Sequence, residues 1–207
     1  MTYIFLSLLF LFYHIFAYVE LTPMEYLPTF AIKFMRWPVS EVSLLMSIFF
    51  GTHCAGRFLG VPLSFVLRPR TMIIVNLFLT TAACCILLSV QRLPELLWAS
   101  AALFGIGMAT TYATAVLWTA ESVTVSGRVA SIVVGGGSFG SVIQPQIVGR
   151  LFDVPAAGGP MSMVYVLITA SLVHTVLFVC MLLFVARCHV RETVVSVPTS
   201  SPTLVEQ

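Results

Sequence analysis

Side chains able to do chemistry are sparse in this sequence, and the notable ones lie within long apolar stretches. Glu20 occurs in the first stretch, and Arg57 occurs in the next, four residues after His53. No nucleophile–base pair or metal-ligand spacing is recognisable, so we expect neither an enzyme, nor a cofactor, nor a metal site. A charge inside an apolar stretch instead predicts contact with a solute, a coupling ion or an opposite charge.

Glu20 and Arg57 each allow two interpretations. Glu20 either accepts a hydrogen bond from a substrate or couples a cation, or it reaches interfacial water because Pro23 ends the span. Arg57 either lines water or forms a structural ion pair, with Glu20 as its candidate partner. His53 shares a helix face with Arg57, and we interpret it as a hydrogen-bonded packing histidine.

The composition indicates that a bilayer surrounds these stretches. Hydrophobic residues make up 59% of the 207 residues and charged residues 9%, with a mean hydropathy of +1.03. A spanning helix needs about 20 mostly apolar residues. We therefore predict an all-α membrane protein with a six-helix bundle over residues 1–186 and a polar, disordered tail over 187–207. The six predicted spans are 3–31, 42–66, 71–90, 94–118, 127–149 and 161–186.

The loops predict the orientation. An even number of spans puts both termini on one side, and that side carries slightly more Lys and Arg, which favours cytoplasmic termini. We expect an integral, multi-pass protein of the plasma membrane in contact with lipid. A formal net charge of +2 gives no reason to expect a nucleic-acid partner.

Small residues mark the faces where helices are expected to meet. Gly56 and Gly60 form a small-xxx-small pair in the second span. In the fifth span, small residues recur every four positions from Gly137 through Pro145, which predicts a packing or gating face that tolerates flexing. Gln144 lies beside this proline and is our candidate for a solute contact.

The fourth span carries polar and aromatic groups. Tyr112 lies within a run of threonines, and Trp118 lies near the end of the span. Trp118 is interpreted either as an interfacial anchor or as an aromatic platform on which a sugar stacks.

Taken in order, these motifs resemble the C-terminal half of a major facilitator superfamily transporter, and within that superfamily they are similar to the sodium-dependent glucose transporter (major facilitator domain-containing protein 4) group. The resemblance runs from about residue 16 to residue 153. It rests on the following residues: Glu20 followed by Tyr26-Leu-Pro-Thr-Phe-Ala31, Ser47-Ile-Phe-Phe-Gly51-Thr with Arg57, Pro69-Arg-Thr-Met72, Gly105-Ile-Gly-Met108-Ala-Thr, Gly127-Arg128, and the glycine-rich run to Pro145.

The resemblance implies a central substrate site between two six-helix halves, lined by the first, fourth and fifth helices of each half. It implies a secondary active transporter that moves a small polar solute, such as the hexose glucose, by alternating access coupled to sodium or protons. The implied partner is an N-terminal six-helix half or a second copy. The alternative is a non-transporting interaction or regulatory module. The implied cavity residues are Glu20, Tyr26, Tyr112, Trp118 and Gln144, with Arg57 in packing or gating.

Overall fold

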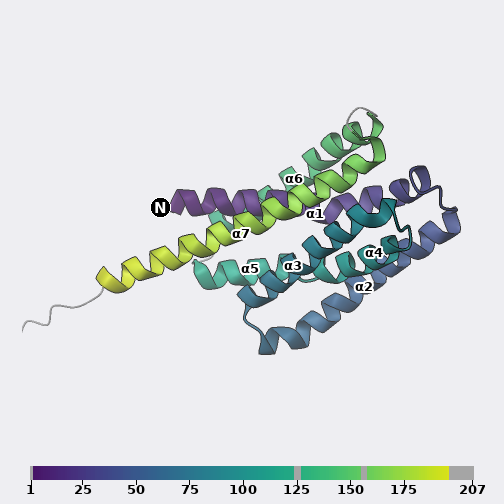
Figure 1. Ribbon diagram of the computed structural model, residues 1–207. Coiled ribbons are helices and arrows are strands. Elements are labelled where there is room, and N and C mark those ends of the chain that lie inside the picture. Colours follow the sequence, from purple (N-terminus) through teal and green to yellow (C-terminus); the bar gives the residue numbers. More distant parts are fainter. Residues whose placement is uncertain (1, 124–126, 155–157, 196–207) are drawn as a thin grey trace, which may run out of the picture.

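The computed structural model describes residues 2–123, 127–154 and 158–195, and Figure 1 shows that helices account for almost all of them. No strand occurs in these three ranges, so the predicted all-α class is confirmed. The helices are α1 (Thr2–Lys33), α2 (Val39–Val66), α3 (Pro69–Leu88), α4 (Leu96–Met108), α5 (Thr111–Ser122), α6 (Gly127–Asp153) and α7 (Ser162–Val195), with short 3-10 turns η1 (Ser89–Gln91) and η3 (Gly159–Met161).

Five helical segments in the described ranges are both long and apolar enough to cross a membrane: α1, α2, α3 with η1, α4 with α5, and α7. The chain is thus an integral, multi-pass membrane protein. The remaining long helix, α6, has 27 residues, or about 40 Å at about 1.5 Å per residue, which exceeds a hydrocarbon core of about 30 Å. Its glycines, serines and glutamines lower its hydropathy, and it is not one of these five segments. The predicted span at residues 127–149 stays a prediction.

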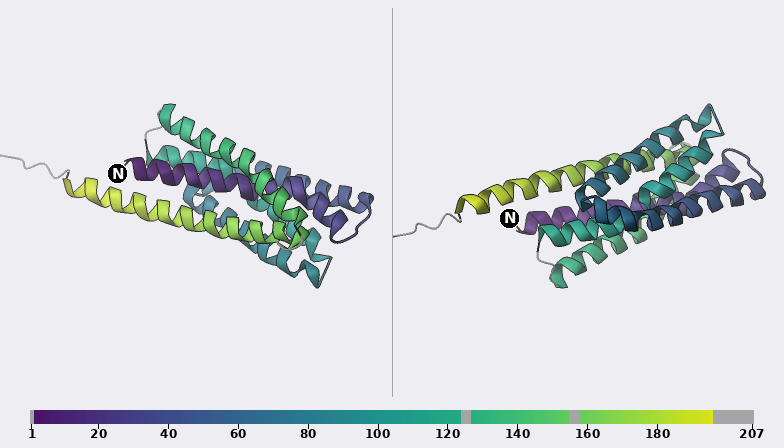
Figure 2. Two further views of the ribbon diagram at one scale, coloured as in Figure 1. Left: turned by 90° about the horizontal axis from the view of Figure 1, so that it is seen from above. Right: turned by 90° about the horizontal axis from the view of Figure 1, so that it is seen from below.

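The start of α1 and the end of α7 lie at the same end of the bundle (Figures 1 and 2). One boundary differs from the prediction by several residues. α7 continues to Val195, although the tail was predicted to begin at residue 187. The remainder of that predicted tail, 196–207, lies outside the described residues.

The fourth predicted span is two helices rather than one. α4 ends at Met108 and α5 begins at Thr111. The Ala109 amide donates to the Ile106 carbonyl, three residues back, and the backbone at Thr110 has φ −114° and ψ 0°. This interruption places a non-helical turn inside a membrane-length segment.

The helices pack as two related groups. α1 packs on α6 and α7, while α4 packs on α2 and α3, and these are the most extensive contacts between elements. α1 runs parallel to α6, since Phe10 meets Gly136 near one end and Lys33 meets Asp153 at the other. α2 likewise runs parallel to α4, since Phe49 meets Gly105 and Gly56 meets Ala109.

Glycines let the parallel pairs approach closely. A Cβ at Gly136 would lie 2.6 Å from the Phe10 carbonyl oxygen, and one at Gly140 would meet the His14 carbonyl and lie 2.7 Å from Ala17 Cβ. Gly137 was expected on this face, but a Cβ there would have no atom within 4 Å. In this part of α6, the residues that approach α1 most closely are therefore Gly136 and Gly140 rather than Gly137.

Candidate functional site

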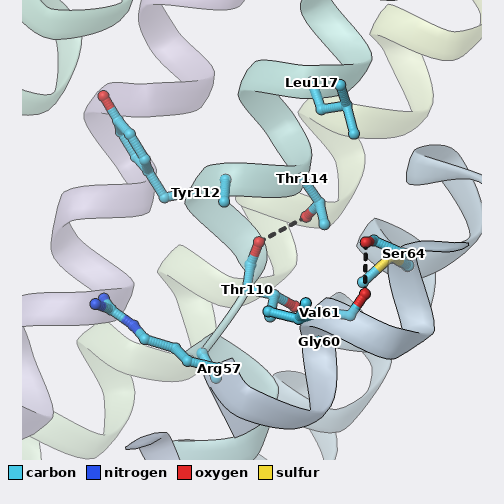
Figure 3. A pocket seen from close by; sticks show the side chains of 11 residues that line it. Arg57, Gly60, Val61, Ser64, Thr110, Tyr112, Thr114 and Leu117 are labelled. Atoms are coloured by element: carbon cyan, nitrogen blue, oxygen red, sulfur yellow. Dashed lines mark hydrogen bonds between the residues drawn. The ribbon is translucent and has the colours of Figure 1, made fainter.

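A cavity of about 480 Å³ lies between α2, α3 and α5, beside the α4–α5 interruption (Figure 3). Ligand pockets in proteins span about 300–1,000 Å³, so this volume is large enough for a small solute. Its lining residues are Arg57, Gly60, Val61 and Ser64 of α2, Met72 of α3, Ala109 and Thr110 of the interruption, and Tyr112, Ala113, Thr114 and Leu117 of α5.

The interruption is held in place by side chains. Asn76 of α3 donates from Nδ2 to Thr110 Oγ1 at 2.8 Å, and the Thr114 hydroxyl donates to the Thr110 carbonyl at 2.8 Å. Asn76 is buried, so this amide holds the Thr110 hydroxyl from behind the cavity. Since its oxygen already accepts a hydrogen bond, the Thr110 hydroxyl is left to act as a donor.

Arg57 and Tyr112 bring the strongest polar groups to the cavity. Both side chains are exposed and point to the same side in Figure 3, and neither has a hydrogen-bond partner among the described residues. The Tyr112 ring packs edge-on against Tyr13 at 5.5 Å and lies 5.8 Å from the Phe16 ring. These contacts with α1 orient the Tyr112 ring.

Glu20 lies near this cavity without lining it. The side chain is partly buried on α1, and Arg57 is close enough for the two charges to interact. These two described residues do not form an ion pair, in contrast to Lys33 and Asp153, whose charged groups are 3.7 Å apart. The Glu20 carboxylate and the Arg57 guanidinium are therefore not bound to each other.

Gly56 and Gly60 let α2 approach the α4–α5 interruption closely. A Cβ at Gly56 would lie 2.7 Å from Ala109 Cβ, and one at Gly60 would meet the Thr110 methyl group. Both glycines therefore seat α2 against the interruption. His53, one turn earlier, contacts the Gly105 carbonyl through Nδ1 at 3.3 Å, as expected of a packing histidine.

Three of the predicted residues meet at the α1–α6 interface instead. The Tyr26 hydroxyl donates to the Pro145 carbonyl at 3.0 Å, and its oxygen would lie 3.0 Å from a Cβ at Gly149. Gln144 donates from Nε2 to Thr22 Oγ1 at 3.0 Å. These residues join α1 to α6, and none of them lines the cavity between α2 and α5.

Trp118 lies in a packed core, where only 6% of its surface is exposed. Its ring is 5.3 Å from Phe178 of α7 and 6.5 Å from Phe5 of α1. This position matches neither an interfacial anchor nor a stacking platform, because both would leave an open ring face.

The structure thus brings together Arg57, Gly60 and Tyr112, with Glu20 nearby, and separates them from Tyr26, Trp118 and Gln144. Sequence reasoning missed Asn76 and the interruption that it supports. A signal was present, since Asn76 is the one asparagine in the chain and lies in an apolar run. In membranes, such amides hydrogen-bond across helices.

The cavity offers hydrogen-bond donors, a cation and an aromatic edge. Within the described ranges, no group of three His, Cys, Asp or Glu side chains is placed to hold a metal ion. Such a surface can bind and orient a polar molecule.

Comparison with known proteins gives a consistent result. The family model described as Major Facilitator Superfamily matches residues 1–203. The mouse sodium-dependent glucose transporter 1A is 29% identical over 95% of this chain and 46% of its own length. Human sodium-dependent glucose transporter 1 is 33% identical over 70% of this chain and 28% of its own. Human major facilitator superfamily domain-containing protein 4A is 28% identical over 75% of this chain and 29% of its own length.

The chain therefore spans less than half the length of these curated relatives. No solved structure matches the chain. The family match covers nearly all of the sequence, and the all-α bundle with parallel α1–α6 and α2–α4 pairs agrees with it. This chain belongs to the major facilitator superfamily, a class of membrane transporters.

Proposed function

We propose that this chain forms one half of a secondary active transporter and carries part of the binding site for a small polar solute. The observation that supports this most is the cavity beside the α4–α5 interruption, lined by Arg57, Thr110 and Tyr112. A charged side chain inside a membrane bundle is costly unless it faces a partner or a water-filled space. A solute pathway between helices gives Arg57 that space.

The proposed solute is a hexose such as glucose, a molecule rich in hydroxyl groups. The names of several relatives refer to sodium-dependent glucose transport, and the lining of this cavity suits such a molecule. Arg57 and the Thr110 and Tyr112 hydroxyls can donate hydrogen bonds to sugar oxygens. Glu20 can accept one, or can bind the coupling cation, whether sodium or a proton.

We further propose that transport requires a second six-helix half or a second copy of this chain. Transporters of this class place their site where two repeats meet and move by rocking one against the other. Here Arg57 is exposed and Tyr112 is 43% exposed, so the cavity has a wall on one side only. We propose a plasma-membrane location with cytoplasmic termini.

The test is hexose uptake by the assembled carrier, comparing Tyr112→Phe with Tyr165→Phe. Each substitution removes one hydroxyl from a tyrosine that is about half exposed, but Tyr165 lies on α7, away from this cavity. Loss of one hydrogen bond, about 0.5–1.5 kcal/mol, should raise the KM about 2- to 10-fold for Tyr112→Phe. The control should keep the original KM.

Equal KM values for the two variants would contradict the proposal that this cavity is part of the solute pathway. Uptake should also depend on the oligomeric state. Saturable transport by a demonstrably monomeric 207-residue chain would contradict the requirement for a second half. Specific association with another membrane protein, without any flux, would instead favour an interaction module.

A further inference from the structure

A second cavity, of about 350 Å³, lies between α1, α7 and the end of α6, the helices that Figure 2 shows side by side. The first cavity is lined instead by α2, α3 and residues 109–117. On α7 the lining of the second cavity includes Ser162, Val166, Ala170 and Val173. These residues are three or four positions apart and therefore share one helix face. The cavity is thus a groove that follows one side of α7.

The groove runs from one membrane surface toward the middle of the bilayer. Ser162 is the first residue of α7, and the groove also includes Leu151, two residues before Asp153. Asp153 pairs with Lys33, and both of these side chains are exposed, so this end of the groove lies near the bilayer surface. Val173 lies about 16 Å further along α7, at about 1.5 Å per residue. That distance is about half of a hydrocarbon core of about 30 Å.

A buried hydroxyl marks the shallow end of the groove. Ser162 is 3% exposed, and its hydroxyl oxygen has no hydrogen-bond partner among the described residues. An unpaired polar group inside a bilayer is costly, so this hydroxyl requires a partner. Val166, Ala170 and Val173 continue the same face with apolar side chains. The groove therefore has a polar group near the membrane surface and mainly apolar walls deeper in the bilayer.

The lining favours a sterol over other membrane lipids. None of the described side chains that line the groove carries a charge, whereas anionic lipid headgroups are held by basic pockets. A sterol has a single hydroxyl, which both donates and accepts as the serine hydroxyl does. Ile15, Val166 and Val173 are β-branched and stiff, and Ala170 is small. Such walls suit a rigid ring system, which loses little conformational freedom on binding.

We propose that this groove binds a membrane sterol, with the sterol hydroxyl bonded to Ser162 and the ring system packed along Val166, Ala170 and Val173. The bound sterol would brace α7 against α1. The site does not rest on the transport function proposed above, because it is a different cavity and its test requires no transport.

The experiment measures sterol binding to the purified full chain in phosphatidylcholine nanodiscs that contain a photoreactive cholesterol analogue at a series of mole fractions. The proposal predicts saturable labelling of α7 between residues 162 and 173, located by mass spectrometry and displaced by excess unlabelled cholesterol. Labelling that rises in proportion to the sterol content, without saturation or displacement, would overturn the proposal, because the groove would then hold any bilayer lipid.

The matched variants are Val173→Trp and Val176→Trp. Both valines are exposed on α7, but of the two only Val173 lines the groove. The indole at position 173 would fill the groove, so Val173→Trp should weaken the apparent sterol affinity at least tenfold. Val176→Trp should keep the affinity of the unchanged chain. Equal affinities for the two variants would overturn the proposal.

The variant Ser162→Ala tests the polar end of the groove and adds no bulk, so it also serves if Val173→Trp does not fold. Loss of one hydrogen bond should weaken the apparent cholesterol affinity about 2- to 10-fold. The 3α-epimer of cholesterol, whose hydroxyl points to the other face of the ring, should bind the unchanged chain more weakly than cholesterol does. A Ser162→Ala chain that binds cholesterol as tightly as the unchanged chain would overturn the proposed site.

Discussion

The closeness of α1 and α6 predicts that two neighbouring glycines will respond in opposite ways to the same substitution. In a helix interior, Ala is favoured over Gly by about 1 kcal/mol. A Cβ at Gly137 would have no atom within 4 Å, so Gly137→Ala should raise the free energy of unfolding by up to about 1 kcal/mol. At Gly140, the Cβ would meet the His14 carbonyl and lie 2.7 Å from Ala17 Cβ.

Overpacking of this kind costs about 1–3 kcal/mol. After the helix-propensity gain is subtracted, Gly140→Ala should lower the free energy of unfolding by about 0–2 kcal/mol. The two variants should therefore differ by about 1–3 kcal/mol. Gly136→Ala should behave like Gly140→Ala, because its Cβ would lie 2.6 Å from the Phe10 carbonyl oxygen.

The assay is reversible unfolding of the purified chain in mixed micelles, monitored by circular dichroism across a denaturant series. Gly137→Ala is the control, since it makes the same chemical change in the same helix. Equal shifts for Gly137→Ala and Gly140→Ala would refute the proposed α1–α6 contact. A larger loss of unfolding free energy for Gly137→Ala than for Gly140→Ala would show that Gly137 lies on the packing face.

Three further substitutions test other parts of the structure. Trp118→Ala should lower the free energy of unfolding by about 3–5 kcal/mol, because it empties a packed core, and a loss below about 1 kcal/mol in the same unfolding assay would contradict that burial. Asn76→Leu removes the hydrogen bond to Thr110 and should lower the free energy of unfolding by about 0.6–2 kcal/mol. It should also raise the KM for hexose uptake, and an unchanged KM would show that the Asn76–Thr110 hydrogen bond does not support solute binding. Lys33→Ala breaks a pair whose side chains are 58% and 77% exposed, so it should cost less than about 1 kcal/mol and less still in high salt; a loss that high salt does not reduce would point to another role for Lys33.

The helices could be predicted because long apolar stretches allow few other structures in a bilayer. The residues through which the helices contact one another could not be predicted in the same way. Three consecutive glycines at residues 135–137 allow several small-residue stripes, and only the approach of α1 selects Gly136 and Gly140. Trp118 was ambiguous for a related reason, since its burial depends on Phe5 and Phe178, which are distant in sequence.

The cavity was predicted in part. The sequence names Tyr112 as a candidate cavity residue and Arg57 as a candidate packing or gating residue, and both line the cavity between α2 and α5. Their role in solute binding stays a prediction. The interruption between α4 and α5 was missed, although its residues carry a signal. Threonine hydroxyls at residues 110 and 111 compete for backbone hydrogen bonds, and Gly107 lowers helix propensity. These effects are weak alone, and the turn needs the Asn76 amide and the close glycines of α2 to hold it.

The central claim, that the cavity beside the α4–α5 interruption holds the solute, is tested most directly by solute protection. The variants Ala113→Cys and Ala120→Cys are made in a chain without its native cysteines and assembled into the active carrier. Both alanines are exposed on α5, but only Ala113 lines the cavity. Saturating hexose should slow the reaction of a thiol reagent with the Ala113→Cys variant and leave the Ala120→Cys variant unaffected. Equal reaction rates with and without hexose at Ala113→Cys, in a carrier that still transports hexose, would place the solute elsewhere.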